Sequence, residues 1–377
     1  MDFLSLILIT TTFFSAADTA CITPKASQFA NASSGKIREA GEMRSPRAAH
    51  TATLLKDGRV LVVGGFVTGG GAIAASETFA SASGRFEPVG NLLNPRASHS
   101  ATLLPNGKVL IAGGFNGEYL RSTEIFDPQT GTFAKGPDMT IARSEHTATV
   151  LSDGRILLAG GVGTGWTFLA DAEIFDPETG RFMRVGRMST PRESHTATLL
   201  KDGKVLITGG HKDRRDNITI FATAELFDPK KESFETISDL RVKRHKHAAV
   251  LLKNGHVLIV GGSDENDSRG AYTSLEMFDP KTRTFRLAGE MRKSRYKLNG
   301  AVVLLANGRV LIAGGSDGAE VYDPETNVTS EVAGGFGSHR LFATSTLLNN
   351  GEVLIIGGYD RSTSVSKGTW LFDGNTR

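Results

Sequence analysis

Short aliphatic runs that end in a pair of glycines recur along the chain at intervals of 43 to 53 residues. The pairs are Gly64-Gly65, Gly113-Gly114, Gly160-Gly161, Gly209-Gly210, Gly261-Gly262, Gly314-Gly315 and Gly357-Gly358. Each apolar run has the length of a β-strand rather than of a helix. A repeat of about 50 residues that contains several short strands is typical of a propeller, in which each repeat forms one blade. The pattern therefore predicts an all-β ring of seven blades.

The repeat at residues 143–188 shows the layout expected of one blade. Asp153-Gly154 separates two apolar, β-prone segments and is typical of a tight hairpin turn. A second turn at residues 177–180 separates two further strand-like segments. Asx-Gly pairs occupy the first turn in the other six repeats as well. We therefore expect four antiparallel strands in every blade, and we interpret the glycine pairs as places where strands approach closely.

The two ends of the repeat region predict how the ring closes. The last repeat stops after its third strand-like segment, at residues 369–373. The missing fourth strand is found at the other end of the chain, because residues 34–43 align with the fourth-strand segment at residues 130–139. An N-terminal strand that completes the last blade removes an open sheet edge, so we expect this closure.

The double glycine, the Phe-Asp-Pro third strand, the aromatic fourth strand and the arginine before the first strand resemble the kelch repeat. The resemblance covers residues 35–377 and is closest in style to bacterial extracytoplasmic kelch proteins. It implies a seven-bladed kelch-type β-propeller. Kelch propellers include protein-binding modules, sugar-active enzymes and oxidases, so the fold does not determine the function.

Galactose-oxidase-like copper enzymes carry a similar propeller, and the resemblance to them implies a cysteine crosslinked to a metal-binding tyrosine. The only cysteine in this chain is Cys21, close to the N-terminus. We therefore do not expect that copper chemistry, and we predict no cofactor and no metal.

A cation stands ten residues before each Asx-Gly turn. These residues are Arg47, Arg96, Arg143, Arg192, Arg244, Lys297 and Arg340. In a sevenfold ring they would meet near one mouth of the central channel and could hold carboxylates or phosphates. The resemblance supports this reading, because an arginine here commonly contacts acidic ligands in kelch binding modules.

The alternative is structural, because a glutamate also recurs once per repeat in the third strand. These residues are Glu77, Glu124, Glu173, Glu225, Glu276 and Glu320. A buried arginine must be paired, so under this alternative each cation serves only to bind its glutamate across strands. Blade seven separates the two readings, since Trp370 replaces the glutamate and leaves Arg340 without that partner.

A histidine follows three residues after the cation in five repeats. The five are His50, His99, His146, His195 and His247, and the last two repeats have Gly300 and Ala343 in their place. Metal ligands must converge on one point, whereas a repeat distributes these histidines around the ring. We interpret each imidazole as hydrogen-bonded to a neighbouring strand.

The loops after the glycine pairs vary in sequence, and variable loops on a rigid scaffold commonly carry binding sites. Trp166 and Phe168 lie in one such loop, beside a basic loop at 211–215 and an acidic loop at 264–267. The candidate binding residues here are Trp166, His211 and Arg215, in a mixed recognition face. Plainly solvated loops are the alternative, as is a calcium site formed by the acidic loop, although that loop lacks the usual glycine spacing.

An apolar run at residues 3–17 ends in small side chains, which is typical of an export leader. We therefore predict a signal peptide over residues 1–20 and a flexible arm over residues 21–34. Export is therefore expected, with a cytoplasmic location if the leader is misassigned. The net charge is only +3, and no nucleic acid partner or transmembrane span is expected. The sequence favours an exported, monomeric protein that binds a protein or glycan ligand, with acidic ligands among the candidates. The alternative is a carbohydrate-active enzyme, mutarotase- or lyase-like, at the channel mouth.

Overall fold

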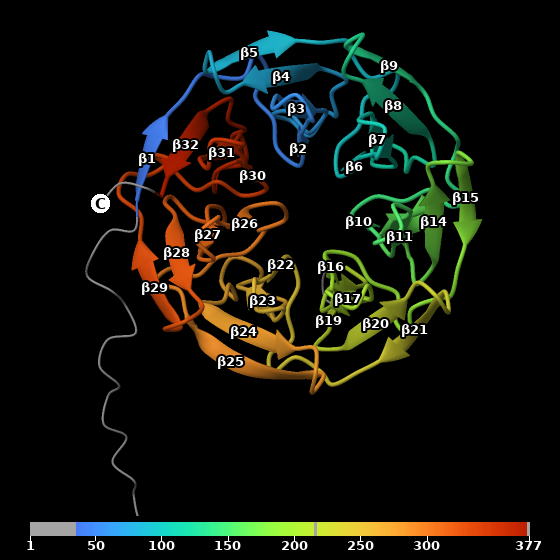
Figure 1. The fold of residues 1–377 in the computed structure, drawn as a ribbon, viewed down its shortest axis with the longest axis vertical. Helices are drawn as coiled ribbons and strands as arrows, with labels where there is room; N and C mark the ends of the chain where they lie inside the picture. The colour runs from blue at the N-terminus through green and yellow to red at the C-terminus, as the bar shows by residue number, and fades with distance from the viewer. Residues whose placement is uncertain (1–34, 215–216, 375–377) are drawn as a thin grey trace, which may run out of the picture.

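The protein forms a ring of seven four-stranded antiparallel sheets around a central channel (Figure 1). The computed structural model describes residues 35–214 and 217–374. The predicted signal peptide, the whole of the predicted arm and Arg215 lie outside the described residues. A short 3-10 turn, η1 (Thr164–Trp166), stands among the strands and loops. The predicted all-β seven-bladed propeller is confirmed.

The blades follow one another in chain order. Blade one contains β2 (Thr51–Leu54), β3 (Val60–Val63), β4 (Ser76–Ala80) and β5 (Arg85–Pro88), and blade two contains β6 (Ser100–Leu103), β7 (Val109–Ala112), β8 (Thr123–Asp127) and β9 (Thr132–Lys135). Blade three contains β10 (Thr147–Val150), β11 (Ile156–Ala159), β14 (Ala172–Asp176) and β15 (Arg181–Arg184), and blade four contains β16 (Thr196–Leu199), β17 (Val205–Thr208), β20 (Ala224–Asp228) and β21 (Ser233–Thr236). Blade five contains β22 (Ala248–Leu251), β23 (Val257–Val260), β24 (Ser274–Asp279) and β25 (Thr284–Glu290), and blade six contains β26 (Val302–Leu304), β27 (Val310–Ile312), β28 (Glu320–Asp323) and β29 (Val328–Glu331).

Blade seven is built from both ends of the propeller. It contains β30 (Thr344–Leu347), β31 (Val353–Ile356), β32 (Thr369–Asp373) and the N-terminal β1 (Lys36–Glu39). Strand β1 pairs antiparallel with β32, with Lys36 opposite Asp373 and Glu39 opposite Trp370. Figure 1 shows the blue first strand beside the red last strand. This pairing closes the ring as expected and covers the free edge of β32.

The hydrophobic core is divided among the seven interfaces between blades. The second strand of each blade is fully buried, as in Val60–Val63 of β3. At the interface of blades one and two, Leu61 and Val63 pack with Ile111 and Phe126 in one cluster. Equivalent clusters lie at the other six interfaces. Because burial occurs between neighbours, each blade depends on the next and on ring closure.

The glycine pairs lie where adjacent blades touch. Gly64 has a φ of 60°, and a Cβ added there would lie 2.3 Å from the Arg96 carbonyl oxygen of the next blade. Gly65 has a φ of 105°, and its added Cβ would lie 2.8 Å from the Ala48 oxygen. Both the backbone conformation and the space exclude a side chain. The interpretation of the pairs as close-approach positions is confirmed.

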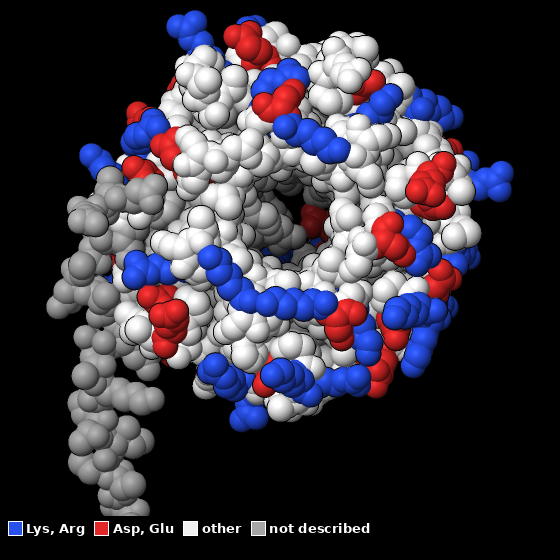
Figure 2. Space-filling view, in the orientation of Figure 1, with Lys and Arg blue, Asp and Glu red and all other residues white. Residues whose placement is uncertain are grey.

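The two faces of the ring differ in what they carry. We name the face with the Asx-Gly hairpins the turn face, and the face with the variable loops that follow the glycine pairs the loop face. The channel is open in the space-filling view, with acidic side chains visible inside it (Figure 2). None of the described segments is a helix with the length and apolar character of a membrane span.

Candidate functional site at the loop-face mouth of the channel

The repeated arginines are buried in the blades, each beside its glutamate. The ion pairs are Arg47–Glu77, Arg96–Glu124, Arg143–Glu173, Arg192–Glu225, Arg244–Glu276 and Arg295–Glu320, with nitrogen to oxygen distances of 2.7 to 3.0 Å. The arginine side chains are only 0–1% exposed. In blade four, Arg192 Nη1 also donates to the Gly209 carbonyl oxygen at 2.7 Å. These contacts link the loop before each first strand to the second and third strands, as the structural alternative requires.

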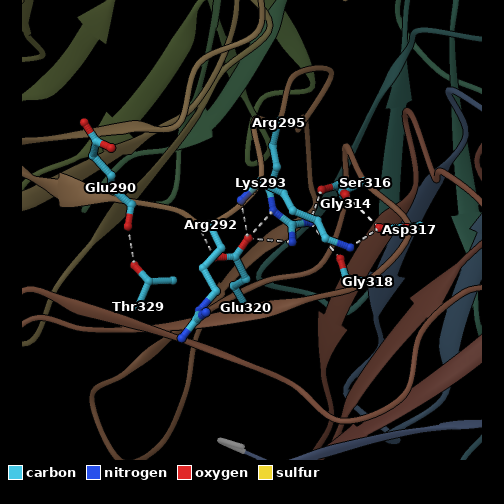
Figure 3. Close-up of polar contacts among 10 residues, drawn as sticks. All are labelled: Glu290, Arg292, Lys293, Arg295, Gly314, Ser316, Asp317, Gly318, Glu320 and Thr329. Atoms are coloured by element: carbon cyan, nitrogen blue, oxygen red, sulfur yellow. Dashed lines mark hydrogen bonds and ion pairs between the residues drawn. The ribbon is translucent and has the colours of Figure 1, made fainter. Parts of the chain in front are cut away.

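In blade six the cation that pairs with the glutamate is Arg295 rather than the predicted binding residue Lys297. Counting ten residues back from the turn selects Lys297, but Arg295 occupies the buried position and bonds to Glu320 through Nη2 at 2.9 Å (Figure 3). Arg295 Nη1 donates to the carbonyl oxygens of Gly314 and Gly318. Blade six has two more residues between this arginine and its turn than the other blades have. Lys297 is thereby placed at the channel mouth instead.

Blade seven departs from the pattern as expected. Arg340 lies over the ring of Trp370, with 4.8 Å between its guanidinium carbon and the ring centroid. Its Nη1 donates to Ser338 Oγ at 2.7 Å, and its Nη2 donates to the Phe336 carbonyl oxygen at 2.9 Å. The side chain is half-buried, so a cation–π contact and neutral acceptors replace the carboxylate here. A binding role for Arg340 and for the other repeated cations stays a prediction.

The five repeated histidines bond to the preceding blade. The contacts from Nε2 to a hydroxyl oxygen are His50–Thr344, His99–Thr51, His146–Ser100, His195–Thr147 and His247–Thr196, at 3.0 to 3.1 Å. Burial lowers the pKa of His50 and of His195 to about 3, so these rings are neutral. The interpretation of the histidines as interblade bonds is confirmed. In blade six, Leu298 rather than Gly300 follows three residues after the buried arginine, because of the same insertion.

The second residue after the repeated arginine lines the channel mouth, and five different residue types occupy this position in the seven blades. We call these residues, two after the buried arginine, the mouth ring. They are Ala49, Ser98, Glu145, Ser194, Lys246, Lys297 and Phe342, and each has a φ between 50° and 56°. Backbone bonds connect neighbours, as from Ser98 N to Ala49 O and from Glu145 N to Ser98 O. Non-glycine residues at positive φ carry strain that a function can explain.

The mouth ring carries opposite charges on its two sides. Glu145 lines a cavity of about 290 Å³ with Ser98, Phe342 and Asn299. Burial raises the pKa of Glu145, and the nearby Glu193 raises it further. On the other side, Lys246 Nζ lies 2.6 Å from Asp267 Oδ1. The ring therefore places an acid in blade three and two lysines in blades five and six.

A buried chain of acids and histidines lies beside the ring. His211 Nε2 is 3.0 Å from Glu193 Oε1, and the two Nδ1 atoms of His211 and His245 are 3.0 Å apart. His245 Nε2 lies 3.5 Å from Asp267 Oδ1. If both rings are neutral, His211 donates to Glu193 and His245 donates to His211, so His245 Nε2 carries no proton. Burial lowers the pKa of His211 to about 3 and of His245 to about 4, which favours this state.

An aromatic and cationic patch lies on the adjoining loops. Trp166 is 59% exposed and stands on a hairpin held by β12 (Val162–Gly163) and β13 (Thr167–Phe168). The Arg214 guanidinium lies 5.2 Å from the Trp166 ring centroid and 5.4 Å from that of Phe168. Tyr119 meets Trp166 edge-on at 5.9 Å. We call Tyr119, Trp166, Phe168 and Arg214 the Trp166 patch.

The predicted loop residues have separate places in this arrangement. Trp166 is exposed, whereas His211 is buried and bonded to Glu193. The acidic loop is engaged by the protein's own cations, because Asp267 pairs with Lys246 and Glu265 pairs with Lys243. In the described part of the chain, no three His, Cys, Asp or Glu side chains are arranged to hold a metal ion.

Sequence reasoning missed the mouth ring because it followed the repeated residues. Repeated polar residues such as Arg192 and His195 hold the blades together, whereas the residue between them varies from blade to blade. The sequence does contain a signal for the mouth ring. At this one position of an otherwise regular repeat the residue type changes between blades, as in Glu145, Lys246 and Phe342.

Comparison with known proteins agrees with this architecture, which is that of a seven-bladed propeller. The model of the Kelch motif matches residues 96–140, 143–189 and 244–292. These three segments of the chain are therefore kelch repeats. No curated protein matches the sequence significantly.

Among solved structures, the chain is similar to a copper-bound fungal alcohol oxidase of the AA5 family. The TM-score is 0.71 at 15% identity, over 90% of this chain and 76% of that one. At this identity the likeness shows the fold alone.

Proposed function

We propose that this protein is an exported kelch-repeat binding protein that recognises a protein or glycan ligand through its loop face. The observation that carries the proposal is the Trp166 patch. A tryptophan that is 59% exposed, on a hairpin with its own strand pairing, is prearranged for contact. Tryptophan, tyrosine and arginine are the residue types that dominate binding energy at interfaces. Little conformational entropy is lost when such a rigid surface binds.

The ion pairs below the patch add to this prearrangement. Arg214 bonds to Glu193 Oε1 at 2.7 Å while its guanidinium lies over two aromatic rings. Glu193 in turn holds His211, so the patch rests on the buried chain between blades four and five. The ligand surface is therefore supported by the scaffold rather than by free loops.

The test is a glycan and peptide array probed with the purified protein and two variants. Trp166→Ala removes the centre of the patch. Met183→Ala is the matched control, because Met183 is also an exposed large side chain, at 47%, but lies on the outer strand β15 of the same blade. We expect array hits that disappear with Trp166→Ala and persist with Met183→Ala. Hits that persist with Trp166→Ala would show that the ligand is recognised at another surface.

A second candidate function is a carbohydrate-active enzyme at the channel mouth, of the mutarotase or lyase kind. One observation favours it: Glu145, a carboxyl whose pKa burial raises, lines the cavity of about 290 Å³. A carboxyl of raised pKa is suited to general acid or base catalysis. The test is NMR of any sugar that the array selects, in which the rate of anomer interconversion is measured with and without the protein. A faster rate with the protein indicates turnover, and an unchanged rate indicates binding alone.

A further inference from the structure

The charges of the mouth ring are separated across the channel. Glu145 stands in blade three, Ser98 and Ser194 flank it, and Lys246 and Lys297 follow in blades five and six. Because all seven ring residues share one backbone conformation and one repeat position, their side chains leave the ring at equivalent places. The ring is therefore a fixed frame on which the sequence places one negative and one positive pole.

The negative pole is Glu145, whose carboxylate can accept further hydrogen bonds. In the described part of the chain, the one hydrogen bond to the Glu145 carboxylate comes from Ser98 Oγ to Oε1. A carboxylate accepts about four hydrogen bonds when all its lone pairs are used. Glu145 also lines the channel cavity, so a small ligand can reach it.

The positive pole is Lys297, whose partners are aromatic. Its Nζ donates to Tyr359 Oη at 2.6 Å and lies 5.1 to 5.6 Å from the ring centroids of Tyr296, Phe342 and Tyr359. No described carboxylate forms an ion pair with it, whereas Lys246 pairs with Asp267. An ammonium has three donors, so Lys297 keeps donors for a ligand.

The cavity that Glu145 lines reaches the surroundings of Lys297, because it is also lined by Phe342, whose ring centroid lies 5.6 Å from Lys297 Nζ. The charge of Glu145 acts across the ring. Burial chiefly raises the pKa of Tyr359 to about 12, and the charges of Asp267 and Glu145 add to this rise. Glu145 also acts to raise the pKa of Lys246, against the lowering caused by burial. A simple anion at the mouth is attracted by Lys297 but repelled by Glu145 and Glu193, and a simple cation meets the opposite conflict. A ligand that carries both charges satisfies both poles.

We propose that the mouth ring binds a small dipolar molecule, whose carboxylate contacts Lys297 and whose ammonium contacts Glu145. The inference rests on the proposed binding function and names a ligand class for the channel mouth. The cavity of about 290 Å³ is just below the usual range of ligand pockets, about 300 to 1,000 Å³, which limits the ligand to a small molecule or to the end of a larger one. Phe342 supplies an apolar wall for the carbon chain between the two charges.

The experiment is isothermal titration of the full chain with ω-amino acids of increasing length: glycine, 4-aminobutanoate and 6-aminohexanoate. Butanoate and butylammonium are the matched probes with a single charge. We expect one member of the series to bind at least about tenfold more tightly than either singly charged probe. Glu145→Gln and Lys297→Met should each weaken that binding at least about tenfold, while Met183→Ala, on the outer strand β15 and outside the mouth ring, retains it.

Thermal melts of the three variants establish that each is folded before titration. If no amino acid of the series binds measurably to the folded wild-type protein, the inference is overturned. It is also overturned if butanoate binds as tightly as the best amino acid. Failure here is distinct from failure of the proposed function, because Trp166→Ala tests the patch and leaves both poles unchanged. Array hits lost in Trp166→Ala together with a silent titration would keep the binding function and remove its dipolar ligand.

Discussion

Replacing one buried glutamate tests whether the repeated ion pairs hold the propeller together. Glu225 Oε1 accepts from Arg192 Nη2 at 2.9 Å, and Oε2 accepts from the Ser189 backbone N–H at 2.8 Å. The variant Glu225→Gln keeps the shape but turns an amide NH₂ toward one of these two donors. It also leaves Arg192, which is 0% exposed, without its counter-charge. Breaking a buried pair from one side costs about 3 to 5 kcal/mol.

The matched control is Glu235→Gln in the same blade. Glu235 pairs with Arg283 at 2.9 Å, but the two side chains are 59% and 42% exposed. An exposed pair contributes about 0 to 1 kcal/mol. Urea unfolding followed by circular dichroism gives the free energy of unfolding for both variants, provided that the slope is unchanged. A loss below about 1 kcal/mol for Glu225→Gln, equal to that of the control, would refute the structural account of the ion pairs.

Two further predictions concern acid and the glycine pairs. The pKa of His195 is about 3 in the folded protein and 6.5 when unperturbed, so protonation favours the unfolded chain. The contribution of each such histidine to the free energy of unfolding is therefore complete above about pH 6.5. Below that pH the free energy of unfolding falls by about 1.4 kcal/mol per pH unit. His195→Leu, which copies Leu298 of blade six, should reduce the slope of unfolding free energy between pH 6 and pH 4 by about that amount, and an unchanged slope would contradict the assignment. Gly64→Ala places a Cβ 2.3 Å from a backbone oxygen at a φ of 60° and should cost more than about 2 kcal/mol in urea unfolding. Gly69→Ala, with a φ of 92° and nothing within 4 Å, is its control and should cost only the backbone strain of about 1 to 2 kcal/mol; equal losses would show that close approach is not the reason for the pair.

The sequence predicted those features that the repeat itself encodes. Seven glycine pairs and seven Asx-Gly turns specify the blades, and the alignment of residues 34–43 with a fourth strand specified the closure by β1. The pairing of Arg192 with Glu225 was foreseen as an alternative because both recur once per repeat. Local turn chemistry and hydrophobic pattern determine these features, and both are visible in a single sequence.

The remaining features depend on contacts between segments that are distant in the chain. Asn299 and Gly300 shift blade six by two residues, and only the buried position of Arg295 shows that Lys297 is free to face the channel. His211 and His245 are 34 residues apart and meet because a loop of blade four packs against the start of blade five. Such contacts follow from the three-dimensional packing of loops, which the repeat pattern does not encode.

Trp166 can report directly on ligand binding at the loop face. The chain has two tryptophans; Trp166 is exposed, whereas Trp370 is buried in blade seven. Titration of an array-selected ligand should change the tryptophan fluorescence of the wild type and of Met183→Ala with the same dissociation constant. In Trp166→Ala the fluorescence change should vanish and calorimetry should show binding weakened at least about tenfold. A full-strength calorimetric signal in Trp166→Ala would contradict the account.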